Sequence, residues 1–226
     1  MTMTLPRCLK SALLSSALML STLPASAQPA PPGQPTAAAT DARRWVETRH
    51  AAVSRLLRTN ADAGTAAIAT RDAQVARILN DMLDVEALGR AALNPYFGQQ
   101  TPADQTEFVS LLRQLIERNY RNNLDSTLDW AVTYSPAEAG PDRTMVVRTT
   151  ARSRTNVRAT PVNIEYRLSP RGAGWVVHDL VTNGSSLVQS YREAYTRIIR
   201  DRGFPELLRR LRQRVANMGQ AGAVQP

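Results

Sequence analysis

Few side chains of this chain are suited to catalysis. It has two histidines and one cysteine in 226 residues. His50 lies in a charged N-terminal segment, where we predict an exposed helix. His178 and Asp179 are adjacent on a predicted strand, so their side chains point to opposite faces and cannot pair directly. One enzymatic hypothesis stays open, in which Asp179 or His178 acts as a general base in a pocket.

Metal and phosphate sites have no recognisable pattern in the sequence. There is no HxxxH or HExxH motif, no glycine-rich phosphate loop and no tight cluster of carboxylates. The only cysteine, Cys8, lies within the N-terminal targeting signal described next. Its removal with that signal would exclude disulfides and cysteine-ligated metals. We therefore predict no cofactor and no metal, and no catalytic residue.

The N-terminus is typical of a cleaved secretory signal. Arg7 and Lys10 precede an uncharged apolar run over residues 11–23, and Ala25-Ser26-Ala27 is a small-x-small cleavage site. The run is shorter than the roughly 20 residues of a membrane-spanning helix, although a retained anchor is the alternative. We predict a signal peptide over residues 1–27, a Pro/Ala-rich linker over 28–40, one domain over 41–218 and a disordered tail over 219–226.

The chain is basic, with a formal charge of +9. The predicted signal holds two of these cations and no acid, which leaves +7 for the exported protein. Export makes nucleic acid an improbable partner, so the surplus favours an anionic membrane face or an acidic protein. A predicted last helix concentrates Arg209, Arg210 and Arg212 on one side. An alternative function is therefore a periplasmic chaperone or adaptor that binds a protein through this helix.

The first half of the domain is predicted to be helical. Apolar residues at helical spacing occur over residues 41–57 and 72–82, and Asp62 can cap the second of these helices. A short helix begins at Asp84 and ends before Asn94-Pro95. Thr101, Pro102 and Asp104 are a helix start signal, and the long helix that follows to about residue 124 has a broad apolar arc. Such an arc fits either a core helix or one that contacts both a sheet and a ligand.

The second half changes to strands and then returns to helices. Four antiparallel strands are predicted near residues 130–134, 144–152, 162–168 and 175–181, and two helices follow, the first of which is capped by Ser186 with Gln189. Segregated helices and strands of this kind indicate an α+β fold. Asp179 is predicted to brace the Gly184-Ser185-Ser186 turn by accepting hydrogen bonds from its backbone amides. Asp179, Gly184 and Ser186 are thus assigned a structural role.

The order of these elements and several motifs resemble the MlaC/toluene-tolerance family. The motifs are Trp175-x-Val-x-Asp179, Gly184-x-Ser186-Leu187, Tyr191-Arg192, Pro95-Tyr-Phe97 and the closing Gly203-x-x-x-Leu207-x-x-x-Leu211. The resemblance implies an NTF2-like cone, in which helices wrap a curved antiparallel sheet of about four strands around a lipid cavity. Two positions depart from the family pattern, which often has an aromatic residue at His178 and an acid at Asn183.

The resemblance also implies a function. Family members are soluble periplasmic carriers that hold phospholipid acyl chains inside and exchange lipid between two membrane complexes. One contains an outer-membrane lipoprotein and porin, and the other is an inner-membrane ABC transporter with an MCE-domain subunit. A hopanoid cargo is the alternative from a related sub-branch. The apolar residues that we predict to contact lipid are Leu112, Ile116, Tyr120, Val132, Tyr134, Val162, Ile164, Tyr166, Val177, Leu187, Val188 and Tyr191.

Overall fold

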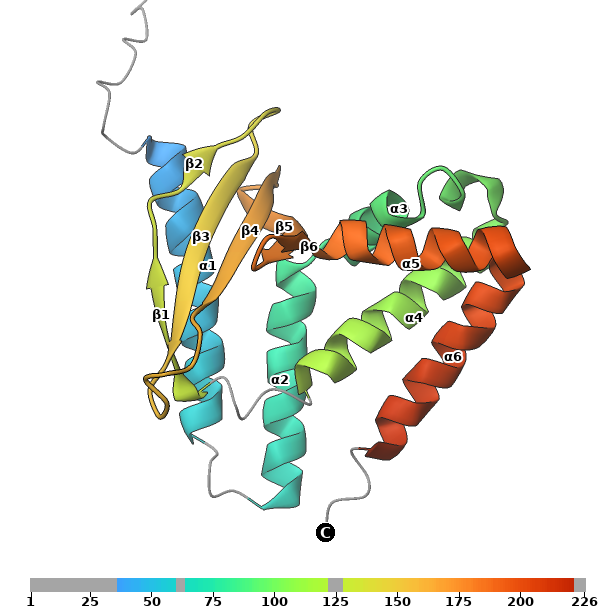
Figure 1. Ribbon diagram of the computed structural model, residues 1–226. Coiled ribbons are helices and arrows are strands. Elements are labelled where there is room, and N and C mark those ends of the chain that lie inside the picture. The colour runs from blue at the N-terminus through green and yellow to red at the C-terminus, as the bar shows by residue number, and fades with distance from the viewer. Residues whose placement is uncertain (1–35, 60–63, 122–127, 222–226) are drawn as a thin grey trace, which may run out of the picture. The chain divides into compact units, whose positions relative to one another are not determined.

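Helices begin and end the folded domain, and strands lie between them (Figure 1). The computed structural model describes residues 36–59, 64–121 and 128–221. The helices are α1 (Ala37–Thr59), α2 (Thr65–Met82), α3 (Val85–Leu93), the 3-10 turn η1 (Phe97–Gln99), α4 (Pro102–Arg121), α5 (Leu187–Arg202) and α6 (Phe204–Ala221). The predicted α+β class and helix order are confirmed. The expected cap Asp62 and the end of the long helix near residue 124 lie outside the described residues.

The first helix starts earlier than predicted. Residues 37–40 were assigned to the linker, but α1 already includes them. Three consecutive alanines favour a helix, and Thr36 caps it by accepting a hydrogen bond from the amide of Ala39 at 3.1 Å. Ala39 and Ala42 are buried. Tertiary packing of small residues therefore extends the helix into sequence with a linker-like composition.

One antiparallel sheet carries the strands. Its order is β1 (Trp130–Tyr134), β3 (Met145–Ser153), β4 (Val162–Arg171), β5 (Gly174–Thr182) and β6 (Ser185–Ser186), with the short β2 (Glu138–Ala139) also paired to β3. The four long strands are those predicted. Asn183 and Gly184 form a two-residue hairpin from β5 to β6, and both have positive φ, 48° and 86°. Asn-Gly is the preferred pair for such a turn.

A β-bulge at His178 changes which residues of β5 face the helices. Leu168 pairs with Val177 but Arg167 pairs with Asp179, so His178 is the extra residue. Beyond the bulge Tyr166 pairs with Leu180. Directly paired residues share a face of a sheet, which places Leu180 on the same face as Tyr166. The bulge therefore keeps apolar residues three apart, Val177 and Leu180, on one face of the sheet.

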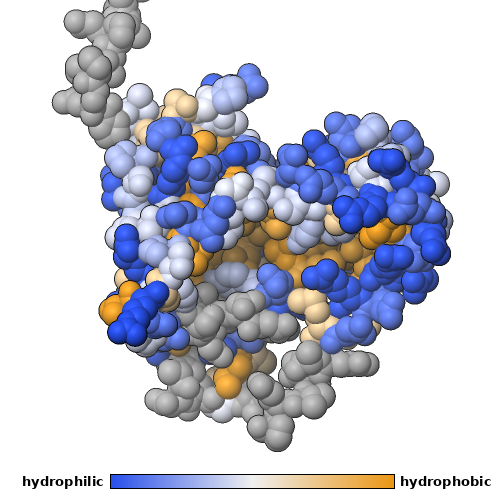
Figure 2. All heavy atoms as spheres, in the orientation of Figure 1, coloured by the Kyte–Doolittle hydropathy of each residue, from blue (hydrophilic) through white to orange (hydrophobic). Residues whose placement is uncertain are grey.

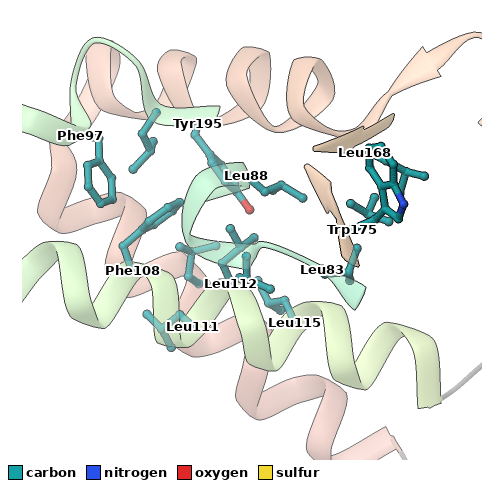
Figure 3. Close-up of a cluster of buried hydrophobic side chains, with 14 of the residues drawn as sticks. Leu83, Leu88, Phe97, Phe108, Leu111, Leu112, Leu115, Leu168, Trp175 and Tyr195 are labelled. Carbon is teal, nitrogen blue, oxygen red and sulfur yellow. The ribbon is translucent and has the colours of Figure 1, made fainter. Parts of the chain in front are cut away.

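The main core lies between the helices and one end of this sheet face (Figure 3). Phe108 of α4 is its centre, with ring contacts to Phe97 at 6.4 Å, to Tyr195 of α5 at 5.8 Å and to Phe204 of α6 at 6.4 Å. Near the start of α1, the side chain of Asp41 accepts a hydrogen bond from the indole of Trp175 at 2.9 Å. These contacts fix the helices around the sheet and leave a cavity toward the far end of α4.

Candidate lipid cavity

A cavity of about 370 Å³ lies between the sheet and four helices. This volume is at the lower end of the about 300–1,000 Å³ typical of small-molecule sites. Figure 2 shows apolar side chains gathered in a hollow between the strands and the helices. The lining residues come from α1, α2, α4, the sheet and the start of α5: His50, Val53, Leu79, Met82, Leu83, Ile116, Asn119, Tyr120, Tyr166, Leu180, Thr182, Ser185, Leu187, Ser190 and Tyr191.

The buried and the exposed residues of the cavity lining differ in polarity. Its buried lining residues are Val53, Met82 and Leu83, whereas the exposed ones are all polar: Asn119, Thr182, Ser185 and Ser190. None of the lining residues is Asp, Glu, Lys or Arg. An apolar interior with an uncharged polar rim matches an amphiphile whose hydrocarbon enters and whose charged group stays in water.

Five of the twelve residues predicted to contact lipid line this cavity: Ile116, Tyr120, Tyr166, Leu187 and Tyr191. Leu112 and Val177 are instead fully buried in the main core, where Figure 3 shows Leu112 beside Leu115. The apolar arc of α4 is thus divided along the helix. Its first turns pack in the core, whereas Ile116 and Tyr120, nearer its end, face the cavity.

The other five predicted contacts lie outside the lining. Val132 is 38% exposed on β1, and Val162 and Ile164 are half-buried on β4. Val188 packs against the main core. Tyr134 contacts the cavity indirectly, because its hydroxyl bonds to His50. Strand alternation correctly places several of these side chains on the inner face, but it does not tell which part of that face stays open.

Sequence reasoning missed most of the helical wall and part of the sheet wall. Val53, Leu79 and Met82 form stripes that are typical of a core, and no sequence signal distinguishes a core stripe from a cavity wall. Leu180 was missed because simple alternation from Val177 places it on the opposite face, and only the bulge at His178 reverses this. Three consecutive apolar residues, Trp175 to Val177, are the one hint that alternation fails on this strand.

His50 was predicted to be exposed, and this prediction is wrong. It is half-buried, lines the cavity, and its Nδ1 lies 2.8 Å from the hydroxyl of Tyr134. Its ring also meets Tyr166 edge-on, with the centroids 5.2 Å apart. Burial lowers the pKa of His50 to about 4, so the imidazole is neutral at neutral pH. Burial also raises the pKa of Tyr120 to about 12.

We expect this histidine to make the protein acid-sensitive. Because the pKa of His50 is about 4 in the folded protein and 6.5 ordinarily, the unfolded chain takes up a proton first as the pH falls. The contribution of His50 to stability should be flat above pH 7 and should fall by about 2 kcal/mol between pH 7 and pH 5. Denaturant unfolding at several pH values measures this. His50→Phe should lose less stability than the wild type over the same range, and equal losses would contradict the assignment.

Asp179 braces the start of α5, although through other atoms than predicted. It is 5% exposed, and its carboxylate accepts hydrogen bonds from the Ser186 hydroxyl at 2.8 Å and from the Val188 amide at 3.1 Å. Arg167 adds a third at 3.3 Å. The predicted partners were backbone amides of residues 184–186. The helix N-terminus is the stronger partner, because its amides lack partners within the helix and its dipole favours an anion. Ser186 in turn accepts from the Gln189 amide at 3.1 Å, as the predicted cap requires.

The positions of His178 and Asp179 do not favour the enzymatic hypothesis. Neither residue lines the cavity. His178 bonds through Nδ1 to the Ser169 hydroxyl at 2.9 Å, and both oxygens of Asp179 are engaged in bracing α5. Within the described ranges, no group of three or more His, Cys, Asp or Glu side chains is placed to hold a metal ion.

The basic face of α6 is partly neutralised within the protein. Arg209 and Arg210 both bond to Glu206 at 2.7 Å, and Arg212 bonds to Glu107 of α4. These pairs are exposed, so each contributes little to stability. They nevertheless reduce the charge available to a partner, which weakens the adaptor alternative. Across the part of the chain that the structure describes, no helix combines the length and apolar character needed to span a bilayer.

Comparison with known proteins agrees with this architecture. Seven solved chains match, among them the phospholipid-binding protein from Ralstonia solanacearum, solved in complex with a phospholipid at 1.53 Å. The match has a TM-score of 0.67 and 24% identity, and covers 79% of this chain and 99% of that one. No curated protein matches. The family model for the MlaC protein matches residues 47–213. The chain therefore belongs to the MlaC family.

Proposed function

We propose that this protein is a carrier of phospholipid, holding acyl chain in the cavity and the head group at its polar rim. The observation that carries the proposal is the cavity itself, whose walls are mostly apolar and aromatic, hold no Asp, Glu, Lys or Arg, and have Asn119, Thr182, Ser185 and Ser190 as their exposed residues. Membership of the MlaC family and the phospholipid bound by the similar Ralstonia protein support the same function. A carrier needs shielding walls and no nucleophile, so we propose no enzymatic activity.

The volume of the cavity indicates how lipid is held. A cavity of about 370 Å³ fits one acyl chain more readily than two. Each methylene removed from water contributes about 0.8 kcal/mol, so a second chain left in water would forgo a large part of the possible binding energy. We therefore propose that the cavity widens for a second chain. The wall that would move is the part of α5 that carries Leu187, Ser190 and Tyr191, turning about the start of the helix that Asp179 holds in place.

We further propose that the protein works in the periplasm between two membrane complexes of the Mla type. The signal-like sequence over residues 1–27 supports export, and family membership supports the outer-membrane lipoprotein and porin complex and the inner-membrane ABC transporter complex as partners. Hopanoid is the alternative cargo. N-terminal sequencing of the exported protein tests the cleavage, and lipid transfer from vesicles to each purified complex tests the shuttling.

The experiment that tests lipid carriage is mass spectrometry of protein purified without detergent. We expect phospholipid to be extracted at up to one molecule per protein, and a hopanoid would be recognised by its mass. A folded protein whose extract contains no lipid, and which takes up none from phospholipid vesicles, would contradict the proposal.

A further inference from the structure

Three side chains of the cavity lining carry polar atoms that lipid shielding alone does not require: His50 of α1, Tyr120 of α4 and Tyr166 of β4. Tyr134 of β1 contacts His50 from outside the lining. His50 Nδ1 and the Tyr134 hydroxyl are 2.8 Å apart, and the His50 ring contacts both Tyr134 and Tyr166. Burial raises the pKa of Tyr166, and the neighbouring hydroxyls of Tyr134 and Tyr120 add to this effect.

Three polar atoms of this group are left without a partner among the described residues. They are His50 Nε2 and the hydroxyls of Tyr120 and Tyr166, whereas Tyr134 is paired with His50. No fully buried side-chain nitrogen or oxygen of the described residues is unpaired. Each of the three atoms therefore keeps some accessible surface, and each belongs to a residue that lines the cavity. Water can bond to them there until hydrocarbon displaces it.

A purely hydrocarbon cargo would leave these atoms unpaired, which costs free energy in an apolar site. An anion is a poor partner, since the imidazole is neutral and the lining holds no Lys or Arg. An uncharged oxygen meets the requirement. A carbonyl accepts from either tyrosine hydroxyl, and a hydroxyl both donates and accepts.

We propose that His50, Tyr120 and Tyr166 form a hydrogen-bonding site inside the cavity for an uncharged oxygen of the bound lipid, either an ester carbonyl or a hydroxyl. The inference rests on the proposed lipid carriage. The further claim is that polar side chains within the apolar wall select among the lipids that the protein can carry. The site discriminates because a lipid without that oxygen leaves the tyrosine and histidine atoms unpaired.

Competition between an ester and an ether lipid tests the carbonyl. The protein is equilibrated with vesicles that contain equal amounts of dihexadecanoyl and dihexadecyl phosphatidylglycerol, which share chain length and head group. Mass spectrometry of the re-isolated protein gives the ratio bound. One hydrogen bond predicts an ester preference of about two- to tenfold in the wild type. Tyr166→Phe and Tyr120→Phe should bring the ratio toward that of the vesicles.

Competition between hexadecanol and hexadecane, both supplied in phosphatidylglycerol vesicles, tests in the same way whether the site binds a hydroxyl. The site is supported if the wild type prefers one member of either pair of lipids and this preference decreases in Tyr166→Phe and Tyr120→Phe. The pair that shows the preference identifies the oxygen, carbonyl or hydroxyl, that the site binds. Tyr96→Phe is the matched control, because it also removes one tyrosine hydroxyl, but from a half-buried residue that does not line the cavity. The control should leave both ratios unchanged.

Two results would overturn the site. In one, the wild type binds each pair in the ratio of the vesicles. In the other, a preference survives unchanged in Tyr166→Phe and Tyr120→Phe. Both require that lipid is bound, so they leave lipid carriage intact. Failure of the wild type to load any of the four lipids would instead contradict the proposed function.

Discussion

Replacing Ile116 and Leu180 together by tryptophan should nearly abolish lipid binding while the protein stays folded. The two side chains face the cavity from α4 and β5. Two indole rings would fill much of the cavity, whose volume is about 370 Å³. Excluding even three methylenes costs about 2.4 kcal/mol, which is a roughly 60-fold loss of affinity. Bound lipid is measured by mass spectrometry after equilibration with limiting phospholipid vesicles, and circular dichroism checks the fold.

The matched control is Ile68→Trp with Val132→Trp. These two apolar residues are 37% and 38% exposed, and neither lines the cavity. The control adds the same two indole rings and should keep the lipid content of the wild type. Val132 was also predicted from the sequence to contact lipid, so loss of lipid in Val132→Trp alone would favour that prediction over the cavity described above. Full lipid content in a folded Ile116→Trp, Leu180→Trp variant would contradict the cavity as the binding site.

Asp179→Ala should be the most destabilising single substitution at the start of α5. It removes three hydrogen bonds at a buried carboxylate, to Arg167, to Ser186 and to the amide of Val188. Hydrogen bonds to charged groups contribute more than neutral ones, but Arg167 is itself 44% exposed, which reduces its share. We expect a loss of about 3 kcal/mol in the free energy of unfolding. The melting temperature should fall by about 6–12 °C.

Two further variants give the expected order of effects. Asp179→Asn keeps one acceptor and should lose less stability than Asp179→Ala. Glu165→Gln should lose less than about 1 kcal/mol, because its pairs with Arg148 and Arg167 lie at the surface. Equal stability of Asp179→Ala and Glu165→Gln would show that Asp179 does not brace the helix. The enzymatic hypothesis, in which Asp179 is a general base, predicts instead that Asp179→Asn abolishes an enzymatic activity. Lipid carriage involves no such activity, so it predicts an effect of this variant on stability alone.

The sequence predicts the elements of this fold well because their signals are local. Asp84 caps α3 by accepting from the Ala87 amide at 2.9 Å, and Thr101 caps α4 by accepting from the Asp104 amide at 3.2 Å, as their spacing indicates. Strand alternation over residues 162–168 is equally local. The start of α1 is less predictable, since its alanines are helical partly through burial against distant residues.

The cavity is predicted less well because it depends on distant contacts. Leu112 and Ile116 are one turn apart on α4 and equally apolar, yet one is core and the other faces the cavity. Phe108, Leu88 and their neighbours in the main core fill the space around the first turns of α4, but not the space beside Ile116. His50 was placed at the surface because its helix is highly charged, while its partner Tyr134 lies 84 residues away. Bulges and long-range pairs of this kind have no local signal.

Photocrosslinking by the lipid tail tests the central claim most directly. A phosphatidylglycerol with a diazirine within one acyl chain is loaded from vesicles, irradiated, and mapped by peptide mass spectrometry. We expect label on the residues that face the cavity, including Ile116, Leu180 and Leu187. Core residues such as Leu112 should stay unlabelled, as should the exposed Val132. Label at Val132 or along α6, with none at Ile116, Leu180 and Leu187, would contradict acyl-chain binding in this cavity.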